Sequence, residues 1–225
     1  MSSCLEKNDL DMIIGDYKSY HSKEKKPFNN KCTDVQILDS VDALKKFLYR
    51  KKINPAPWAK LMKKEIVQNN LFPEGMLFED LGTTYRWLQF SQKIGIIDYV
   101  GYFYFVRTNS AQHSKYNNKK WDLIDISRMI VRDMKKYDER LVKAANNRMF
   151  ISLIQLLRWI DVKKHKCEFR EICLYISDLR KEIITDNSAK VTTRILALFS
   201  CFPRLLNYMG KIYDYVQIDM AAKIK

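Results

Sequence analysis

The chain has 225 residues, of which 47% are hydrophobic and 29% are charged, and its formal net charge is +14 with a pI near 9.5. This composition excludes an intrinsically disordered chain and is typical of a folded protein with one large domain or two small ones. The positive charge favours anionic partners such as nucleotide phosphates, nucleic acid or an acidic membrane surface. Residues 1–118 carry +5 (18 Lys and Arg, 13 Asp and Glu) and residues 119–225 carry +9 (22 and 13), without a concentrated basic arm. Nucleic acid is therefore an unfavoured partner.

The five cysteines are scattered and form no C-x-x-C pair, which argues against a disulfide framework and a zinc site and fits a reducing cytoplasm. Residues 1–11 lack the apolar core of a signal peptide. The longest uncharged apolar run near the C-terminus, Ile195–Pro203, is shorter than the roughly 20 residues of a spanning helix. We expect a cytoplasmic protein that does not span a membrane but can bind peripherally at the inner membrane face.

The first elements in the chain alternate between strand and helix patterns. Asp11–Tyr20 combines an apolar run with alternation, which predicts a strand. Asp34–Lys52 carries apolar residues at helical spacing and ends in a basic turn, which predicts a helix. Two prolines then break the pattern at residues 54–57, and Trp58–Asn69 is predicted to resume as a short strand or helix.

A second alternation follows a turn at Phe72-Pro73-Glu74-Gly75. Glu79–Gln92 is predicted to be a helix, because the acidic residues at its start complement the helix dipole. Ile94–Val106 is rich in branched and aromatic residues and is predicted to form two short strands separated at Gly101. From about Lys119 onward helical spacing recurs and glycine nearly disappears. We expect residues 1–117 to form a mixed α/β sheet domain and residues 118–225 to form a helical C-terminal region.

The first domain resembles the second half of the catalytic domain of family 2 glycosyltransferases, the bacterial polysaccharide-building type. In such enzymes a W-x-K-L segment precedes F-P-x-G-x-x-x-E-D, a helix, a hydrophobic strand and a Y-x-Y-x-x-R-x-x-S segment. The matching residues are Trp58, Lys60, Leu61, Phe72, Pro73, Gly75, Glu79, Asp80, Tyr102, Tyr104, Arg107 and Ser110. The resemblance covers about residues 9–117 and implies a partial nucleotide-diphospho-sugar transferase (GT-A-like) sheet, α/β in class, that lacks its N-terminal nucleotide-binding half.

By this resemblance Asp80 is the catalytic base of an inverting sugar transfer, and Glu79 supports the acceptor or the site geometry. Such a reaction needs a base that takes the proton from an acceptor hydroxyl as it attacks the anomeric carbon. The alternative is structural, with Asp80 as a helix N-cap and Glu79 solvated, since carboxylates are common at that position. The flanking pattern favours the catalytic interpretation.

Four further residues are candidates for donor or acceptor binding. Trp58 is a candidate wall of the acceptor site or a core aromatic, and Lys60 either faces the diphosphate, holds a loop or lies on the surface. Arg107 is placed to neutralise phosphate charge during leaving-group departure, or is an exposed arginine at a strand end. His113 lies in a polar segment where a loop would close on donor or metal, but a lone histidine there is more often solvated.

The family implies a Mn²⁺ or Mg²⁺ ion bridging the donor diphosphate, held by a D-x-D motif in the half that this chain lacks. Asp9-Leu10-Asp11 has the letters of that motif. It is followed, however, by the pattern of the family's later strand, so we interpret it as a chance match and assign no metal ligand in the chain. A partner chain that supplies the donor half is one expectation, and a truncated, non-catalytic remnant is the other.

The C-terminal stretch from Thr192 to Val216 carries apolar residues at helical spacing with interspersed arginine and lysine, and Pro203 is expected to break or kink it. One hypothesis is an interfacial helix pair attracted to anionic lipid. The other, favoured because such stripes are the ordinary way helices pack, is a core-facing amphipathic hairpin.

Three functions are left open by the sequence. The leading hypothesis is an inverting glycosyltransferase that uses a nucleotide-sugar donor and a saccharide or lipid-linked acceptor in polysaccharide assembly. The second is a helical interaction module that has kept the acceptor-side scaffold without catalysis. The third, a basic nucleic-acid binder, would need exposed stacking aromatics beside basic residues, whereas the aromatics at residues 102–105 have the pattern of sheet residues.

Overall fold

The computed structural model describes residues 1–20, 34–105 and 116–212. The chain divides into two compact units, Met1–Gly75 with Glu79–Ser110 (unit 1) and Met76–Phe78 with Ala111–Lys225 (unit 2). The three residues Met76–Phe78 join unit 2 through two contacts. The Leu77 backbone N–H donates to the Asp122 carboxylate at 2.8 Å, and the Phe78 ring stacks on Trp159 with centroids 6.1 Å apart.

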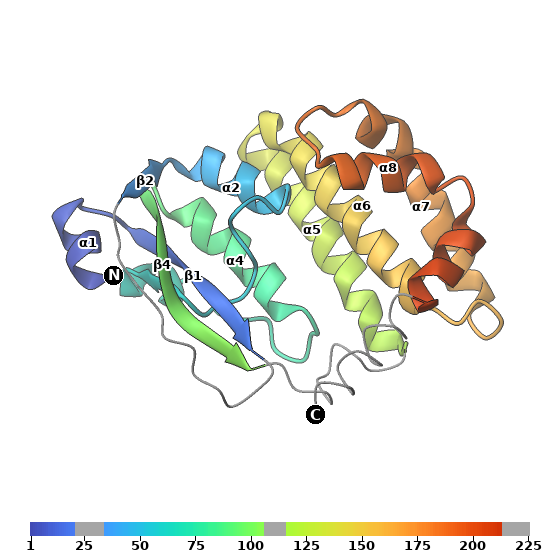
Figure 1. The fold of residues 1–225 in the computed structure, drawn as a ribbon, viewed down its shortest axis with the longest axis horizontal. Coiled ribbons are helices and arrows are strands. Elements are labelled where there is room, and N and C mark those ends of the chain that lie inside the picture. Colours follow the sequence, from blue (N-terminus) through green and yellow to red (C-terminus); the bar gives the residue numbers. More distant parts are fainter. Residues whose placement is uncertain (21–33, 106–115, 213–225) are drawn as a thin grey trace. The chain divides into compact units, whose positions relative to one another are not determined.

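Unit 1 contains a four-stranded mixed sheet in the order β2–β4–β1–β3 (Figure 1). The central strands β1 (Met12–Tyr20) and β4 (Ile94–Phe105) are parallel, while β2 (Val35–Leu38) and β3 (Lys60–Met62) are each antiparallel to their neighbour. The mixed α/β class and the strand over Asp11–Tyr20 are therefore confirmed. Because β1 and β4 are parallel, the connection between them must cross over, and it carries the segments that the sequence singled out for function.

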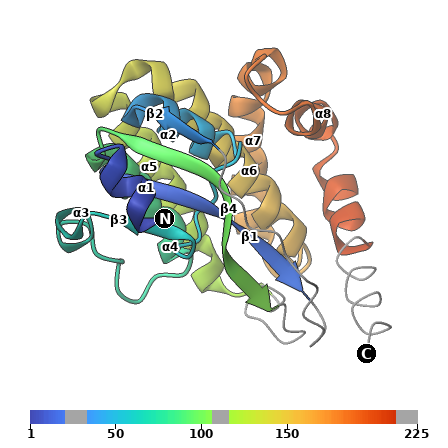
Figure 2. The same ribbon diagram turned by 60° about the vertical axis from the view of Figure 1, so that its left-hand side comes forward.

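Helices cover both faces of this sheet. The short α1 (Ser2–Lys7) packs Met1, Cys4 and Leu5 against a cluster of Leu10, Ile13 and Ile97. On the other side lie α2 (Ser40–Leu48) and α4 (Glu79–Phe90), which contact each other (Figures 1 and 2). A fourth helix, α3 (Lys64–Gln68), follows β3 and contacts α4.

The prediction of one helix over Asp34–Lys52 is wrong at its start. Residues Val35–Leu38 form the edge strand β2, with Val35 opposite Ile97 and Leu38 opposite Ile94. The helix begins only after Asp39, whose carboxylate accepts a hydrogen bond from the Asp42 N–H at 2.8 Å and caps α2. Branched residues that extend a helical pattern also suit a strand, and here pairing with β4 decides between the two.

The prediction of two strands within Ile94–Val106 is also wrong, because β4 runs unbroken from Ile94 to Phe105. Gly101 does not interrupt the strand. A Cβ at this glycine would lie 3.2 Å from the Met1 sulfur and 3.7 Å from the Ala59 Cβ, so glycine here admits close neighbours. The irregularity is a bulge in β4: the register shifts on both sides of Asp16 leave extra β4 residues without a partner in β1, and Gly101, between Val100 and Tyr102, is one of them.

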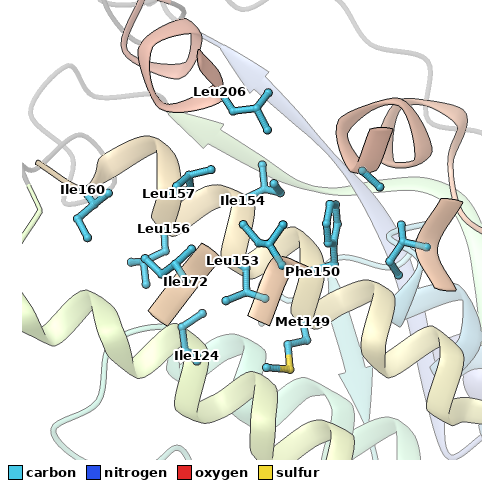
Figure 3. Packing of buried hydrophobic residues seen from close by; sticks show 13 residues of the cluster. Ile124, Met149, Phe150, Leu153, Ile154, Leu156, Leu157, Ile160, Ile172 and Leu206 are labelled. Atoms are coloured by element: carbon cyan, nitrogen blue, oxygen red, sulfur yellow. The ribbon is translucent and has the colours of Figure 1, made fainter. Parts of the chain in front are cut away.

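From Asn118 onward the described part of unit 2 is helical, as predicted for the second half of the chain. Its elements are η2 (Asn118–Trp121), α5 (Asp122–Tyr137), η3 (Glu139–Leu141), α6 (Val142–Trp159), α7 (Lys166–Thr185), α8 (Val191–Phe199) and a helical segment at residues 203–212. The core lies around α6, which contacts α5 on one side and α7 on the other. Figure 3 shows Phe150, Leu153 and Leu157 of α6 at the centre of this core.

At the C-terminal end, the predicted break at Pro203 is confirmed, since α8 ends at Phe199 and residues 203–212 form a separate helix. The favoured core-facing hairpin is wrong for the described part of Thr192–Val216. Most of the large apolar residues of this stretch, Phe199 and Phe202 among them, are exposed, and Leu206 is the exception that points toward Ile154 of α6 (Figure 3). None of the helices in the described ranges is long and apolar enough to span a membrane.

Candidate functional site

The candidate site of unit 1 is built on the segment from Asn54 to Lys60, which lies over the central strands. The Gly15 N–H of β1 donates to the Ala59 carbonyl at 2.8 Å, and a Cβ at Gly15 would lie 2.7 Å from the Tyr99 carbonyl oxygen. Ala59 itself has a φ of +57°, a left-handed conformation that is uncommon for a residue with a Cβ. The glycine allows the β4 backbone to approach β1 closely, and Ala59 turns the chain so that Trp58 and Lys60 are presented beside the central strands.

Lys60 is drawn into unit 1 rather than extended into solvent. Its ammonium donates to the Ala56 carbonyl and to the Asn54 side-chain oxygen, the latter at 3.3 Å. Burial lowers the pKa of Lys60 from 10.5 to about 8, and the attraction of the nearby Asp80 carboxylate acts in the opposite direction. Lys60 therefore holds the 54–60 segment in place and brings a partly desolvated cation close to Asp80.

Asp80 is the second residue of α4, so it lies within the first helical turn and is not the N-cap. Its carboxylate accepts a hydrogen bond from the Leu81 N–H at 2.7 Å. Thr84, one turn further along the same face of α4, donates to the Pro55 carbonyl at 2.6 Å. This bond ties α4 to the segment that carries Lys60. Glu79 is exposed at the start of the helix and lies outside these contacts.

Trp58 forms an aromatic cluster with tyrosines from both central strands. Its ring stacks on Tyr102 and on Tyr104 of β4, with both centroid distances 5.2 Å and the planes 21° and 15° apart. Tyr17 of β1 meets the Trp58 ring edge-on at 6.2 Å. The indole N–H of Trp58 is buried without an acceptor among the described residues. A partly buried aromatic surface next to a few polar groups is typical of ligand sites.

The F-P-x-G turn is held against the side of α4. The Phe72 ring meets Trp87 edge-on at 5.3 Å, and the Trp87 indole N–H donates to the Asn70 carbonyl at 3.0 Å. Gly75 has a φ of +74°, which glycine adopts without the steric cost that a Cβ would add. The motif residues before α4 thus have a local structural reason: they turn the chain and pack it on the helix that begins with Glu79.

The Asp9-Leu10-Asp11 motif has a structural explanation in unit 1. The Asp11 carboxylate accepts the N–H groups of Gln92 at 2.8 Å and Lys93 at 3.1 Å and pairs with Lys63 at 2.7 Å. Burial opposes a lower pKa of Asp11, but Lys63 and the two N–H groups together hold that pKa below its ordinary value. Asp11 therefore fixes the connection between α4 and β4 to the start of β1.

The described residues do not fit a divalent ion of the kind that the resemblance implies. Asp11 is engaged by three donors, and the described ranges hold no group of three or more His, Cys, Asp and Glu side chains suited to a metal. Arg107 and His113, the other candidate donor-side residues, lie outside the described residues, as does Ser110.

The structure thus gathers Trp58, Lys60 and Asp80 from the candidates into one region of unit 1. It also adds Thr84 and Tyr17, which the sequence did not single out. The Thr84 spacing of four residues from Asp80 was a usable signal, since it places both on one helix face. Tyr17 gave no signal, because only the pairing of Tyr17 with Tyr102 across the sheet brings it beside Trp58.

Chemically, the arrangement offers a carboxylate, an ammonium whose pKa is lowered to about 8 and an aromatic wall. Comparison with known protein families finds none that matches this chain, and no curated protein matches its sequence.

Proposed function

We propose that unit 1 is the acceptor side of an inverting glycosyltransferase, with Asp80 as the base that activates an acceptor hydroxyl. The observation that carries this proposal is the convergence of Asp80, Lys60 and Trp58, held together by the Thr84 to Pro55 bond and by the bonds of Lys60. A solvated helix start would not need a half-buried lysine beside its carboxylate.

In this reaction Asp80 takes the proton from the acceptor hydroxyl while the hydroxyl oxygen bonds to the anomeric carbon of the donor sugar. The bond from that carbon to the diphosphate breaks, and its electron pair leaves with the phosphate oxygen. Trp58 serves as a wall that orients the acceptor sugar ring. Lys60 keeps the 54–60 segment in register with α4, and its positive charge lies close to the carboxylate.

The donor-side half that the resemblance implies does not enter these steps. The donor would be a nucleotide sugar, and the acceptor a saccharide or a lipid-linked sugar in polysaccharide assembly. The nucleoside-binding elements and the family's Mn²⁺ or Mg²⁺ would come from a partner chain, because the described residues do not fit that ion.

The test has a binding arm that does not depend on a donor. Acceptor saccharides are titrated into the ¹⁵N-labelled chain, and the indole N–H resonance of Trp58 is assigned by its loss in Trp58→Phe. We expect this resonance to shift on saccharide addition, because a sugar ring stacked on Trp58 changes the environment of its buried indole N–H. An unchanged resonance across a broad saccharide panel would contradict the acceptor site.

The catalytic arm compares Asp80→Asn with Glu79→Gln in sugar transfer from a panel of nucleotide sugars. Loss of a positioned base costs about 10²- to 10⁴-fold in rate, whereas the exposed Glu79 should cost far less. Saccharide binding without transfer by the wild-type chain, alone or with a donor-half partner, would favour the non-catalytic interaction module. Equal rates for wild type and Asp80→Asn would remove Asp80 from the base role.

A further inference from the structure

The C-terminal helices of unit 2 present their large apolar side chains outward. Of the twelve exposed large hydrophobic residues in the described part of unit 2, ten lie between residues 191 and 212. In α8 the buried positions are the small or polar Thr193 and Ala197, and the C-cap Ser200 that follows the helix is also buried. The outward stripe of α8 and the turn after it consists of Val191, Ile195, Leu196, Leu198, Phe199 and Phe202.

The helix at residues 203–212 has the same inverted arrangement. Its inner face docks on α6 through Asn207, which donates to the Leu157 and Ile160 carbonyls at 2.7 and 3.0 Å. Gly210 allows a close approach, because a Cβ there would lie 2.4 Å from the Arg158 side chain. The outer face carries an apolar stripe at the i, i+3, i+4, i+7 spacing, formed by Leu205, Tyr208, Met209 and Ile212.

A basic pocket lies beside this apolar surface. It has a volume of about 590 Å³ and is lined by Val162, Lys163, Lys166, Phe169, Arg170, Cys173 and Arg204. Four of these seven residues are cationic and none is acidic. Arg204 belongs to the pocket and also to the helix at 203–212, where Phe202 and Leu205 on either side of it are exposed. Arg204 thus connects the pocket to the helix that carries the second apolar stripe.

The four pocket cations have no ion pair or hydrogen bond from their side chains to other described residues. The nearest acidic residues along α7 are engaged elsewhere, Glu168 with His165 at 3.4 Å and Glu171 with Arg128 at 3.1 Å. Charge that the protein does not neutralise is available to an anionic ligand. A phosphate group, which has several acceptor oxygens, matches a cluster of arginine and lysine donors.

We propose that residues 191–212 and the basic pocket together bind the surface of an anionic phospholipid bilayer. The apolar stripes enter the boundary between headgroups and acyl chains, and a lipid phosphate enters the pocket. This is the binding mode of interfacial amphipathic helices with cations beside the apolar face. It concerns unit 2 and does not depend on the catalytic role of Asp80.

Charge and composition separate this partner from the alternatives. Residues 187–213 contain four cations and no Asp or Glu, so pairing of this face with a second copy of itself would bring like charges together. Single-stranded nucleic acid is bound by aromatic platforms beside cations, whereas most members of the two stripes are aliphatic. A bilayer with acidic headgroups satisfies both the apolar side chains and the cations.

The first experiment tests the role of charge. It measures co-sedimentation of the full chain with vesicles of phosphatidylcholine alone or of equal parts phosphatidylcholine and phosphatidylglycerol. We expect binding to the mixed vesicles that weakens with salt. The triple variant Lys163→Gln, Arg170→Gln, Arg204→Gln should bind roughly 100-fold more weakly, at about fivefold per cation. The matched control removes three exposed lysines elsewhere, Lys135→Gln, Lys136→Gln and Lys181→Gln, and should change binding far less.

The apolar arm uses Phe199→Ser with Leu205→Ser, and Leu174→Ser as the control, since Leu174 is an exposed leucine of α7 outside the stripes. The paired variant should lose about tenfold or more in vesicle binding and the control almost none. Equal effects of site and control variants, or equal binding to both vesicle types, would overturn the proposal. If the chain bound inorganic phosphate but no vesicles, its ligand would be a soluble anion. If the chain formed a dimer that the paired variant converts to monomers, the apolar face would bind a second copy. Either result would reject the bilayer as the partner.

Discussion

The candidate site of unit 1 and the C-terminal surface of unit 2 use their polar and apolar side chains in opposite ways. In unit 1, Lys60 and Thr84 turn inward and donate to carbonyls of the 54–60 segment. In unit 2, Lys163, Arg170 and Arg204 have no partner for their side chains among the described residues, and the apolar stripes of residues 191–212 face outward. A side chain that the protein itself satisfies organises a site, whereas one that it leaves unsatisfied is available to a partner.

Within unit 2, α6 and α8 show that the same helical spacing has two outcomes. Both helices carry apolar residues three and four positions apart. The α6 stripe is covered because α5 and α7 pack on it (Figure 2). Helix α8 contacts α7, but its large apolar residues are exposed and its buried positions are small or polar. Periodicity identifies an apolar face, but neighbouring elements decide whether the protein covers that face.

The largest predicted effect tests this contrast directly. Phe150→Ala in α6 removes a fully buried ring and should lower the free energy of unfolding by about 3–5 kcal/mol. Phe199→Ala in α8, where the side chain is 52% exposed, should change it by about 0.5 kcal/mol or less. Urea unfolding followed by circular dichroism measures both. Similar losses in the two variants would mean that the outer face of α8 is covered within the protein, contrary to the structure.

The sequence was sufficient for features with a strong local cause. The strand at Asp11–Tyr20, the helix beginning at Glu79 and the break at Pro203 each follow from alternation, acidic residues at a helix start or a missing N–H. It was insufficient where the secondary structure of a segment depends on pairing with a strand that is distant in the sequence. Val35–Leu38 forms a strand because it pairs with β4, and Gly101 stays within β4 because its neighbours Val100 and Tyr102 both pair with β1.

The same distinction between local and distant causes applies to the two proposed sites. Trp58, Lys60 and Asp80 could be selected from their motif, but only the fold shows that Lys60 is half-buried and bonded to its own loop. The basic pocket was missed. The cluster of cations at residues 163–166 was visible in the sequence, but Arg204 reaches it from a separate helix about forty residues later. Charge counts along a chain do not reveal cations that folding brings together.

A smaller effect tests the inward placement of Lys60 through pH. Because its folded pKa of about 8 lies below the ordinary 10.5, the unfolded chain binds more protons between these values, and stability rises with pH in that window. Relative to Lys60→Met, the wild-type chain should gain about 2 kcal/mol between pH 8 and 10.5, after allowance for partial exposure. Lys64→Met, at an exposed lysine of α3, is the control and should show no such trend. A flat difference for Lys60→Met would place Lys60 in solvent.

The smallest effect uses two adjacent threonines of α4. Thr83 and Thr84 are both fully buried, but the Thr84 hydroxyl donates to the Pro55 carbonyl, whereas the Thr83 hydroxyl has no partner among the described residues. Thr84→Val should therefore destabilise unit 1 by about 1–2 kcal/mol, while Thr83→Val should be neutral or stabilising by about 1 kcal/mol.

Helix propensity does not separate the two threonine variants, because Thr and Val differ little in a helix and the change is the same at both positions. The comparison therefore isolates the hydrogen bond between α4 and the 54–60 segment. Thermal unfolding of both variants measures it, and Thr84→Val should also weaken the response of the Trp58 indole resonance to saccharides. If both variants behaved alike, this bond would not hold the segment on α4, and the inward organisation of unit 1 would rest on Lys60 alone.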